Sequence, residues 1–309
     1  MRGLPVHLLI TGAAGFIGSA LTGTLRDAGH TVTALDDLSV VSPRPRPDRL
    51  QVRDVRSLTP ADMEGIDTVV HLAAHKSVPR SFEVGGFEHN ITVDRHLIHT
   101  FAASRARRLL LASSCEVYGQ QIGALAETAA RAPRSPYAAS KAATEHLADI
   151  YRPLVQAERQ IGIVRLFNTF GPTEDPDAVV PAFLDAVAQN RPLTVEGDGS
   201  QARDLTYIDD AITMLSRILD SPQLLPVVNC GSGRSVSIRA LADTIIRATG
   251  AGTITHTAPR PNEIRSFAAD MRLFNSVYGP VSLRPLDRAL AATARGRTGV
   301  WTKPIGARP

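Results

Sequence analysis

Two short stretches of this chain carry side chains whose types and spacing could perform proton-transfer chemistry. In the first, a hydroxyl, a thiol and a carboxylate follow one another as Ser114, Cys115 and Glu116. In the second, Tyr137 and Lys141 stand four residues apart, which places a phenol and an ammonium on one face of a helix. A neighbouring cation favours the phenolate and lowers the tyrosine pKa from about 10. The sequence therefore predicts a tyrosine base that takes a proton from a substrate hydroxyl.

A glycine-rich stretch near the N-terminus has the spacing Gly12-x-x-Gly15-x-x-Gly18 and follows an apolar run typical of a strand. Glycines let the backbone approach a pyrophosphate, and the helix that follows supplies N–H groups and a positive dipole end. Asp36 closes the next strand, where a carboxylate accepts hydrogen bonds from both ribose hydroxyls. Because this carboxylate would repel a 2′-phosphate, we predict NAD rather than NADP. Asp54, near the end of a third strand, is a candidate for the adenine amino group, although a solvated aspartate fits that position too.

The elements that must position these side chains alternate between strands and helices, a pattern typical of βαβ units and a parallel sheet. The predicted strands are Val6–Thr11, Thr31–Leu35, Leu50–Val52, Thr68–Leu72, Leu109–Ala112, Ile161–Phe167 and Val227–Cys230. The predicted helices include Phe87–Ser104, Tyr137–Tyr151, Asp177–Gln189 and Ser237–Thr249. Ligands of such sheets bind outside the carboxyl ends of the strands, so Ser114 is expected at a binding site.

Length and composition narrow the class of protein. The chain has 309 residues, a formal net charge of +4 and 43% apolar residues, which fits a globular protein with a substantial core. No apolar run is long enough to span a membrane, and we expect no secretory signal. Two cysteines argue against a disulfide framework and suit a reducing cytoplasm. The arginines are dispersed, so we expect neither nucleic-acid nor membrane binding, and we predict no metal site.

Motifs along almost the whole chain match those of one family and occur in the same order. They are T-G-A-A-G-F-I-G (11–18), H-L-A-A (71–74), S-S-C-E-V-Y-G (113–119), Y-A-A-S-K (137–141), R-L-F-N-T-F-G-P (165–172), R-D-L-T-Y-I-D-D (203–210) and R-P-N-E (260–263). By these motifs the chain resembles the extended short-chain dehydrogenase/reductase family of nucleotide-sugar epimerases and dehydratases. The resemblance implies a Rossmann domain that binds NAD, and a homodimer. It also implies a nucleotide diphosphate-sugar substrate, with a UDP-sugar favoured and a dTDP-sugar possible.

The resemblance also assigns roles to single residues. Ser114, Tyr137 and Lys141 would form the catalytic triad, with Cys115 and Glu116 beside it. The implied cofactor contacts are Gly12, Gly15, Phe16, Ile17, Gly18, Asp36, Asp54, Ala73, Tyr137 and Lys141. The implied substrate contacts are Lys76, Ser77, Asn168, Val195, Arg203, Arg260 and Glu263. In the substrate set, the asparagine and the two arginines would hold the diphosphate, since guanidinium groups match phosphate oxygens, and the glutamate would hold the ribose.

The last third of the chain departs from strand–helix alternation, which favours a second lobe. The predicted fold class is α/β, a Rossmann-type doubly wound parallel sheet with a smaller C-terminal substrate-binding lobe. We assign residues 1–172 and 205–231 to the NAD-binding domain and residues 173–204 and 232–309 to the nucleotide-sugar-binding lobe. The end, Arg295–Pro309, is expected to be a loosely docked tail.

Two residues depart from the family pattern, and neither is expected to touch the chemistry directly. Val93 stands where the family often has glycine, on a helix expected near the dimer interface, and Phe170 replaces a common tyrosine. The extra side chain at Val93 therefore puts the usual packing of that helix in doubt.

The two residues after the catalytic serine distinguish the reactions of the family. A 4-keto sugar has an acidic proton on carbon 5, so a carboxylate base there permits loss of the 6-hydroxyl when an acid is also present. Glu116 stands at the base position, and Cys115, a thiol with a pKa near 8.5, stands at the acid position. Cys115 could instead be a small buried filler. Glu116 also occurs in a decarboxylase branch, but that branch has arginine where this chain has Ala142.

Four segments resemble the UDP-N-acetylglucosamine 5,6-dehydratases of antibiotic biosynthesis. They are H-K-S-V-P-R-S-F (75–82), C-E-V-Y-G-Q (115–120), R-S-P-Y-A-A-S-K (134–141) and P-R-P-N-E-I (259–264). The leading hypothesis is therefore such a dehydratase, with hydride return from NADH after elimination. A nucleotide-sugar 4-epimerase is the alternative, and a non-catalytic NAD-binding sensor is disfavoured because Tyr137 and Lys141 are both present. The nucleotide, the sugar and the carbon that receives the returning hydride stay open.

Overall fold

A seven-stranded parallel sheet forms the centre of the computed structural model, which describes residues 5–39, 46–83, 85–259, 264–266 and 268–297. In spatial order its strands are β10 (Val228–Cys230), β6 (Gln160–Leu166), β5 (Arg108–Ser114), β4 (Thr68–His71), β1 (His7–Thr11), β2 (Thr31–Asp36) and β3 (Gln51–Val52). The sheet grows outward in both directions from β1, so the order of the strands reverses there. This is the doubly wound Rossmann-type sheet predicted from the sequence.

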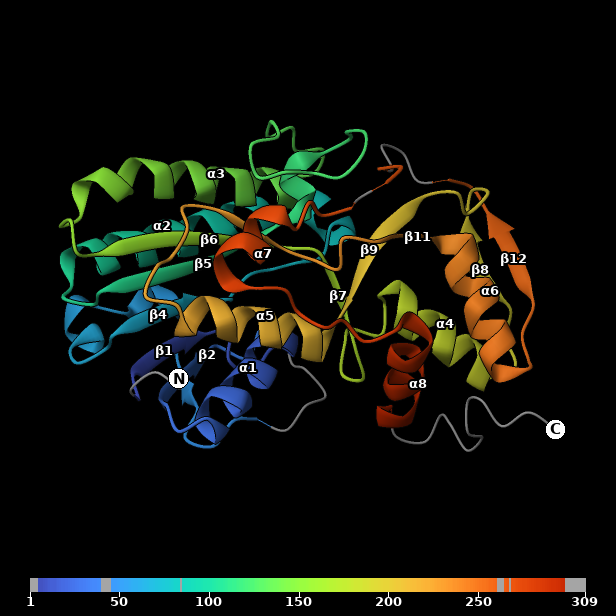
Figure 1. Ribbon diagram of the computed structural model, residues 1–309, viewed down its shortest axis with the longest axis horizontal. Helices are drawn as coiled ribbons and strands as arrows, with labels where there is room; N and C mark the ends of the chain where they lie inside the picture. Colours follow the sequence, from blue (N-terminus) through green and yellow to red (C-terminus); the bar gives the residue numbers. More distant parts are fainter. Residues whose placement is uncertain (1–4, 40–45, 84, 260–263, 267, 298–309) are drawn as a thin grey trace.

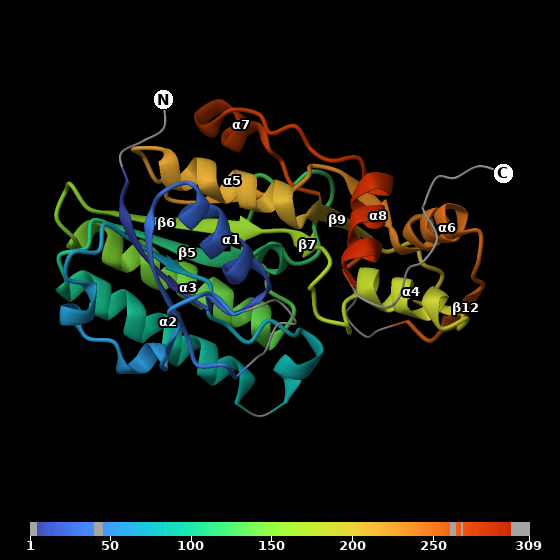
Figure 2. The same cartoon turned by 90° about the horizontal axis from the view of Figure 1, so that it is seen from below.

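Helices cover both faces of the sheet. Helices α2 (Gly86–Ala103) and α3 (Pro136–Tyr151) pack together on one face, and α1 (Phe16–Asp27) and α5 (Ile208–Asp220) pack together on the other (Figure 1; Figure 2). The start of α3 is fixed locally, because the Ser135 side chain accepts a hydrogen bond from the Ala138 N–H and proline occupies the first turn. Tyr137 therefore lies in the first turn of α3, and Lys141 follows one turn later.

The smaller lobe lies beyond one end of the main sheet (Figure 1). A three-stranded sheet there has the order β11 (Ser235–Ser237), β9 (Ala202–Tyr207) and β7 (Asn168–Phe170). A two-stranded sheet joins β8 (Leu193–Glu196) to β12 (Ile254–Thr257), and the helices of the lobe are α4 (Val179–Ala188), α6 (Ile238–Thr249) and α8 (Leu286–Gly296). Helix α7 (Arg272–Tyr278) lies beside α5, over the main sheet (Figure 2). The residue boundaries given above for the two domains stay a prediction.

The chain does not become loosely docked at Arg295, as the sequence suggested. Helix α8 continues to Gly296 and buries Leu290 and Ala294. The Arg297 guanidinium then donates two hydrogen bonds, of 3.0 and 2.5 Å, to the Asp185 carboxylate. This ion pair joins residues far apart in the chain, so the sequence alone could not reveal it. Residues 298–309 lie outside the described residues. Within the described ranges, no helix combines the length and apolar character that crossing a bilayer requires.

Candidate active site

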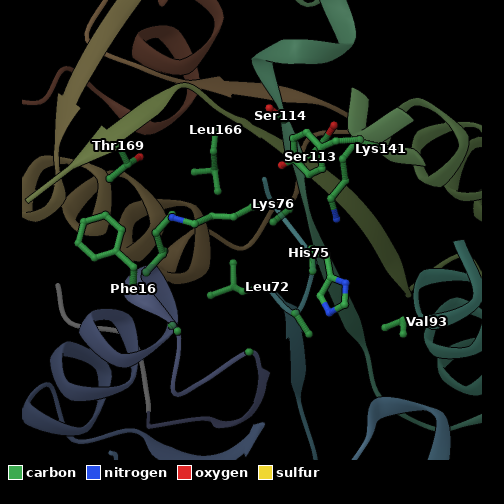
Figure 3. A pocket seen from close by; sticks show the side chains of 18 of the residues that line it. Phe16, Leu72, His75, Lys76, Val93, Ser113, Ser114, Lys141, Leu166 and Thr169 are labelled. Carbon is green, nitrogen blue, oxygen red and sulfur yellow. The ribbon is translucent and has the colours of Figure 1, made fainter. Parts of the chain in front are cut away.

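A cavity of about 330 Å³ opens where the carboxyl ends of β1, β2, β4, β5 and β6 meet. Figure 3 shows Ser114 and Lys141 on one side of it, Phe16 and Thr169 on the other, and Lys76 extending toward Phe16. Most residues predicted to be functional line this cavity. They are Gly12, Gly15, Phe16, Ile17, Gly18, Asp36, Asp54, Ala73, Lys76, Ser114, Cys115, Glu116, Tyr137, Lys141 and Asn168.

The glycine turn is packed too closely for any larger residue. Gly12 has a φ of +69°, and a Cβ there would lie 2.6 Å from the backbone nitrogen of Ala73. A Cβ on Gly18 would lie 2.0 Å from the carbonyl oxygen of Gly12. The N-cap of α1 is Gly15, which has no side chain to bond the first N–H groups of the helix. The first residues of α1 line the cavity, and free N–H groups at the start of a helix suit the oxygens of a pyrophosphate.

The Asp36 carboxylate is fixed at the end of β2 by backbone donors. The Ala14 N–H donates to one carboxylate oxygen at 2.9 Å, and the Leu38 N–H donates to the other at 2.8 Å. Each carboxylate oxygen can accept one more hydrogen bond, so Asp36 keeps capacity for the two hydroxyls of a ribose. The acidic residue therefore both stabilises the glycine turn and fits an adenosine ribose.

Asp54 lies at the same end of the cavity but is already paired. The Arg56 guanidinium donates to its carboxylate at 2.5 to 3.0 Å, and the Arg56 N–H donates at 2.7 Å. The hydrogen bond from Arg56 is the main reason that the pKa of Asp54 is lowered. Contact of Asp54 with an adenine amino group stays a prediction.

The polar trio is positioned by a 3₁₀ turn, η4 (Cys115–Tyr118), directly after β5. The Ser114 hydroxyl accepts a hydrogen bond from the Glu116 N–H at 3.2 Å and so caps this turn. Cys115 is only 2% exposed, and its sulfur lies 4.0 Å from the side-chain oxygen of Asn168. Burial first, and the charge of Glu116 second, raise the pKa of the Cys115 thiol well above its ordinary value. The thiol therefore stays protonated at neutral pH, which suits a proton donor and equally suits packing.

The structure differs from the sequence prediction in the ionisation of Tyr137. Its pKa is raised, chiefly by burial, and a hydrogen bond with Ser114 opposes this only in part. The expected lowering by Lys141 is not seen because the Lys141 ammonium lies 3.5 Å from the Asp94 carboxylate. The charges of Cys115, Glu116 and Asp94 raise the pKa of Tyr137 further. With this raised pKa, Tyr137 is a protonated phenol at neutral pH.

Three buried residues at the site were missed from the sequence. Asp94 and His71 bond each other at 2.8 Å beneath the cavity, and Glu174 lines the cavity with one carboxyl oxygen that has no hydrogen-bond partner. Asp94 belongs to an amphipathic helix, where a charged residue ordinarily indicates the solvent face. His71 belongs to the H-L-A-A motif, which gave the only signal for it.

The predicted substrate contacts are not all brought together. Lys76 lines the cavity, with its ammonium nitrogen 5.8 Å from the centre of the Phe16 ring, and Asn168 lies beside Cys115. Among the described residues that line the cavity, Ser77, Val195 and Arg203 do not appear. Val195 is fully buried in β8, and the Arg203 guanidinium donates to the carbonyls of Ala202 and Ile264. The predictions for Arg260 and Glu263 lie outside the described residues.

Both residues that depart from the family pattern are buried. Val93 is 4% exposed in the interface of α2 with the sheet, and it also lines the cavity. The Phe170 ring packs edge-on against Tyr207, with 5.7 Å between ring centres. Cys230 is fully buried with its sulfur 3.5 Å from that of Met214, so the second cysteine has a packing role.

A doubly wound parallel sheet with a glycine turn after β1 and a fixed carboxylate at the end of β2 defines a dinucleotide-binding protein. The Ser114, Tyr137 and Lys141 side chains in the same cavity make it an enzyme of the short-chain dehydrogenase/reductase type. The chain belongs to the NAD dependent epimerase/dehydratase family, whose model matches residues 8–231. It is therefore an NAD-dependent enzyme of the nucleotide-sugar dehydratase and epimerase superfamily.

Three similar proteins illustrate the range of this family. The structure of TunA, an NAD-dependent NDP-hexosamine 5,6-dehydratase involved in tunicamycin biosynthesis, is 37% identical with a TM-score of 0.90 and covers 94% of this chain and 97% of that chain. The structure of MoeE5 in complex with UDP-glucuronic acid and NAD is 31% identical with a TM-score of 0.86, and it covers 94% of this chain and 98% of that chain. The uncharacterized UDP-glucose epimerase YtcB of Bacillus subtilis is 32% identical over 274 residues, 81% of this chain and 84% of that protein.

Proposed function

We propose that this enzyme is a nucleotide-sugar 5,6-dehydratase, with UDP-N-acetylglucosamine as the leading substrate. The observation that carries the proposal is that Cys115 and Glu116 line the same cavity as Ser114, Tyr137 and Lys141. An oxidation at carbon 4 needs only the last three groups, whereas elimination of water needs an additional base and acid. The similarity to the 5,6-dehydratase TunA at 37% identity supports this reaction.

The residues of the glycine turn and β2 fit the implied cofactor. Gly12, Gly15 and Gly18 would hold the pyrophosphate of NAD, and Asp36 would hold the adenosine ribose. Bound NAD supplies the hydride acceptor for carbon 4 of the sugar and, in its oxidised form, a positive charge on the nicotinamide ring. A nearby positive charge favours a phenolate, which is what Tyr137 requires to act as a base.

The chain's own side chains would then move the protons. Tyr137 takes the proton of the 4-hydroxyl, with the Ser114 hydroxyl as its hydrogen-bond partner. Glu116 next removes the proton from carbon 5, and that electron pair forms the double bond between carbons 5 and 6. The bond from carbon 6 to oxygen breaks as Cys115 protonates the departing hydroxyl, and water leaves. A proton passing from Glu116 to the adjacent Cys115 restores both groups, and Tyr137 returns its proton to oxygen 4 as carbon 4 is reduced again.

Lys76 and Asn168 would contact the diphosphate of the substrate, because both line the cavity beside the catalytic groups. Arg203 and Arg260 would neutralise that diphosphate, and Glu263 would hold the ribose of the nucleotide. Ser77 and Val195 are proposed as further substrate contacts. We further propose a homodimer, in keeping with the family resemblance.

A nucleotide-sugar 4-epimerase is the second candidate, and the similarity to the UDP-glucose epimerase YtcB favours it. In this case Cys115 and Glu116 would contact the sugar without moving protons. Incubation of the purified protein with UDP-N-acetylglucosamine in deuterated water separates the two reactions. Loss of one water with an exocyclic alkene in mass and NMR spectra is expected for the dehydratase. Inversion at carbon 4 without loss of water would contradict the dehydratase proposal and identify the enzyme as a 4-epimerase.

Variants of Glu116 and Cys115 test which side chain removes the proton from carbon 5 and which protonates the departing hydroxyl. Glu116→Gln is expected to lower turnover by at least about a hundredfold, as expected for loss of a general base, with NAD affinity retained. Cys115→Ser is expected to slow elimination by at least about tenfold, because a hydroxyl is a far weaker acid than a thiol. Cys230→Ser is the matched control, since it changes the other buried cysteine away from the cavity and should retain near-normal turnover per folded molecule. Unchanged turnover of Glu116→Gln would remove it as the base.

A further inference from the structure

A buried ion pair lies at the wall of the cavity, which Lys141 lines. The ammonium nitrogen of Lys141, on α3, lies 3.5 Å from a carboxylate oxygen of Asp94, on α2. The exposed fraction is 3% for the Lys141 side chain and zero for that of Asp94. Figure 3 shows the amino end of Lys141 turned toward the side of the cavity where His75 and Val93 lie. Val93 precedes Asp94 in α2, so this direction agrees with the pairing.

Further buried donors hold the Asp94 carboxylate in place. The Thr144 hydroxyl donates to the same oxygen that pairs with Lys141, and His71 bonds the other oxygen at 2.8 Å. An ionised carboxylate only accepts hydrogen bonds, so the Nε2 of His71 carries the proton of that bond. The Nδ1 of His71 then bonds the Thr11 hydroxyl at 2.6 Å, directly before the glycine turn. One chain of bonds thus runs from the glycine turn to Lys141, with Asp94 at its centre.

The charge balance of this network supports an ionised Asp94. Complete burial would raise the pKa of its carboxyl, but the positive charge of Lys141 and the hydrogen bonds from His71 and Thr144 outweigh burial and bring it to about 2. A buried ammonium in turn needs a nearby negative charge to stay protonated, because burial alone disfavours its charged form. Each ion of the pair therefore stabilises the charged form of the other at a buried position.

We propose that Asp94 is a positioning residue that keeps Lys141 a charged ammonium at a fixed place and ties it to the glycine turn. The functional consequence rests on the proposed role of Lys141 beside Tyr137. The groups that face these two residues are His71 from β4, Asp94 from α2, and Cys115 and Glu116 from the turn after β5. Of these, Asp94 alone forms an ion pair with Lys141 among the described residues.

The composition of the chain makes a direct test practical. Its only lysines are Lys76, Lys141 and Lys303, so protein labelled with carbon-13 at the lysine Cε gives three resonances. Lys303→Arg and Lys76→Arg variants assign them. In Asp94→Asn, the titration midpoint of the Lys141 resonance is expected to fall by about one to three pH units, since a buried lysine without a counter-ion loses its proton readily. A midpoint unmoved to within about 0.3 pH units would overturn the proposal.

Glu145→Gln is the matched control, because it also removes a buried carboxylate from an ion pair. Glu145 lies one turn after Lys141 on the same helix, and it pairs with Arg165 at 2.6 Å. This variant should leave the Lys141 midpoint in place, and an equal fall in it would mean a general effect of loosening α3. Asp94→Ser repeats the test if the asparagine variant does not fold, with the same expected fall. An unmoved midpoint in the serine variant counts equally against the proposal.

The pH profile of turnover separates this inference from the proposed function. The Asp94 carboxylate raises the pKa of Tyr137. In Asp94→Asn the acidic limb of kcat is therefore expected to move to lower pH, where Lys141 is still protonated, and kcat should fall as the pH passes the lowered Lys141 midpoint, while KM changes less than about threefold. A fall in the NMR midpoint without any change of the kcat profile would support the role of Asp94 and refute the assignment of Lys141 to the chemistry. An unmoved midpoint refutes the role of Asp94 whatever the profile shows.

Discussion

The buried carboxyl of Glu174 predicts an unusual dependence of stability on pH. Glu174 is 9% exposed, and one of its oxygens lacks a hydrogen-bond partner. Burial raises its pKa from 4.5 to about 8, although the charge of Lys76 opposes this. A raised pKa means that the folded protein holds this proton more tightly than the unfolded chain does.

The sign of the effect follows from which state binds the proton. Below pH 4.5 Glu174 is protonated in both states, and its contribution to stability is fully present. As the pH rises toward about 8 the unfolded chain alone is ionised, so stability is lost, and the loss levels off once the folded protein ionises too. At about 1.4 kcal/mol for each tenfold change in proton affinity, the whole loss is on the order of 5 kcal/mol. Roughly 2 kcal/mol of it falls between pH 6 and pH 8.

Glu174→Gln removes this titration while keeping the shape of the side chain. Urea unfolding followed by circular dichroism at pH 6 and pH 8 should show that the variant gains about 2 kcal/mol relative to the wild type over this interval. Asp177→Asn is the control, because Asp177 is an exposed carboxylate of the same loop, and it should follow the wild type. Parallel pH dependences of Glu174→Gln and the wild type would refute the reasoning.

Two further predictions concern the glycine turn and the core beside the site. Gly18→Ala would bring a Cβ within 2.0 Å of the Gly12 carbonyl oxygen, so NAD should bind at least about tenfold more weakly by calorimetry; an unchanged dissociation constant would show that the turn adjusts. Tyr118→Phe removes a hydroxyl that donates to Asn229 at 2.6 Å, and the unfolding free energy should fall by about 1 to 3 kcal/mol. A fall below about 0.5 kcal/mol would mean that Asn229 finds another partner.

The central sheet could be predicted from the sequence because its strands are continuous apolar runs, as a parallel sheet buried on both faces requires. All seven predicted strands are found, with ends shifted by one or two residues, such as β5, which continues to Ser114. The strands of the smaller lobe escaped prediction because they are short and mixed in polarity. In β12 only the first of four residues is not exposed, so it carries no apolar alternation.

The cavity residues could be predicted where chemistry ties a residue type to a local pattern. A glycine turn needs glycine, and a phenol with an ammonium one turn later is visible in the letters alone. The environment of these groups could not be predicted, because it depends on what α2 places against α3. The spacing of Tyr137 and Lys141 predicts that the ammonium acts on the phenol alone, whereas in the structure the ammonium forms an ion pair with Asp94. Ionisation is a property of the packed site and not of a motif.

The distribution of cations sharpens the roles of the two lysines in the cavity. The chain uses 31 arginines and only three lysines, yet both described lysines line the cavity. Carboxylates from Asp36, Glu116 and Glu174 line it as well, so its side chains do not by themselves make it attractive to a diphosphate. With Lys141 held by Asp94, Lys76 is the lysine left to meet a phosphate there. Among the described groups that line the cavity, Lys76 and the N–H groups at the start of α1, whose dipole favours negative charge, are therefore the ones suited to the phosphates of a ligand.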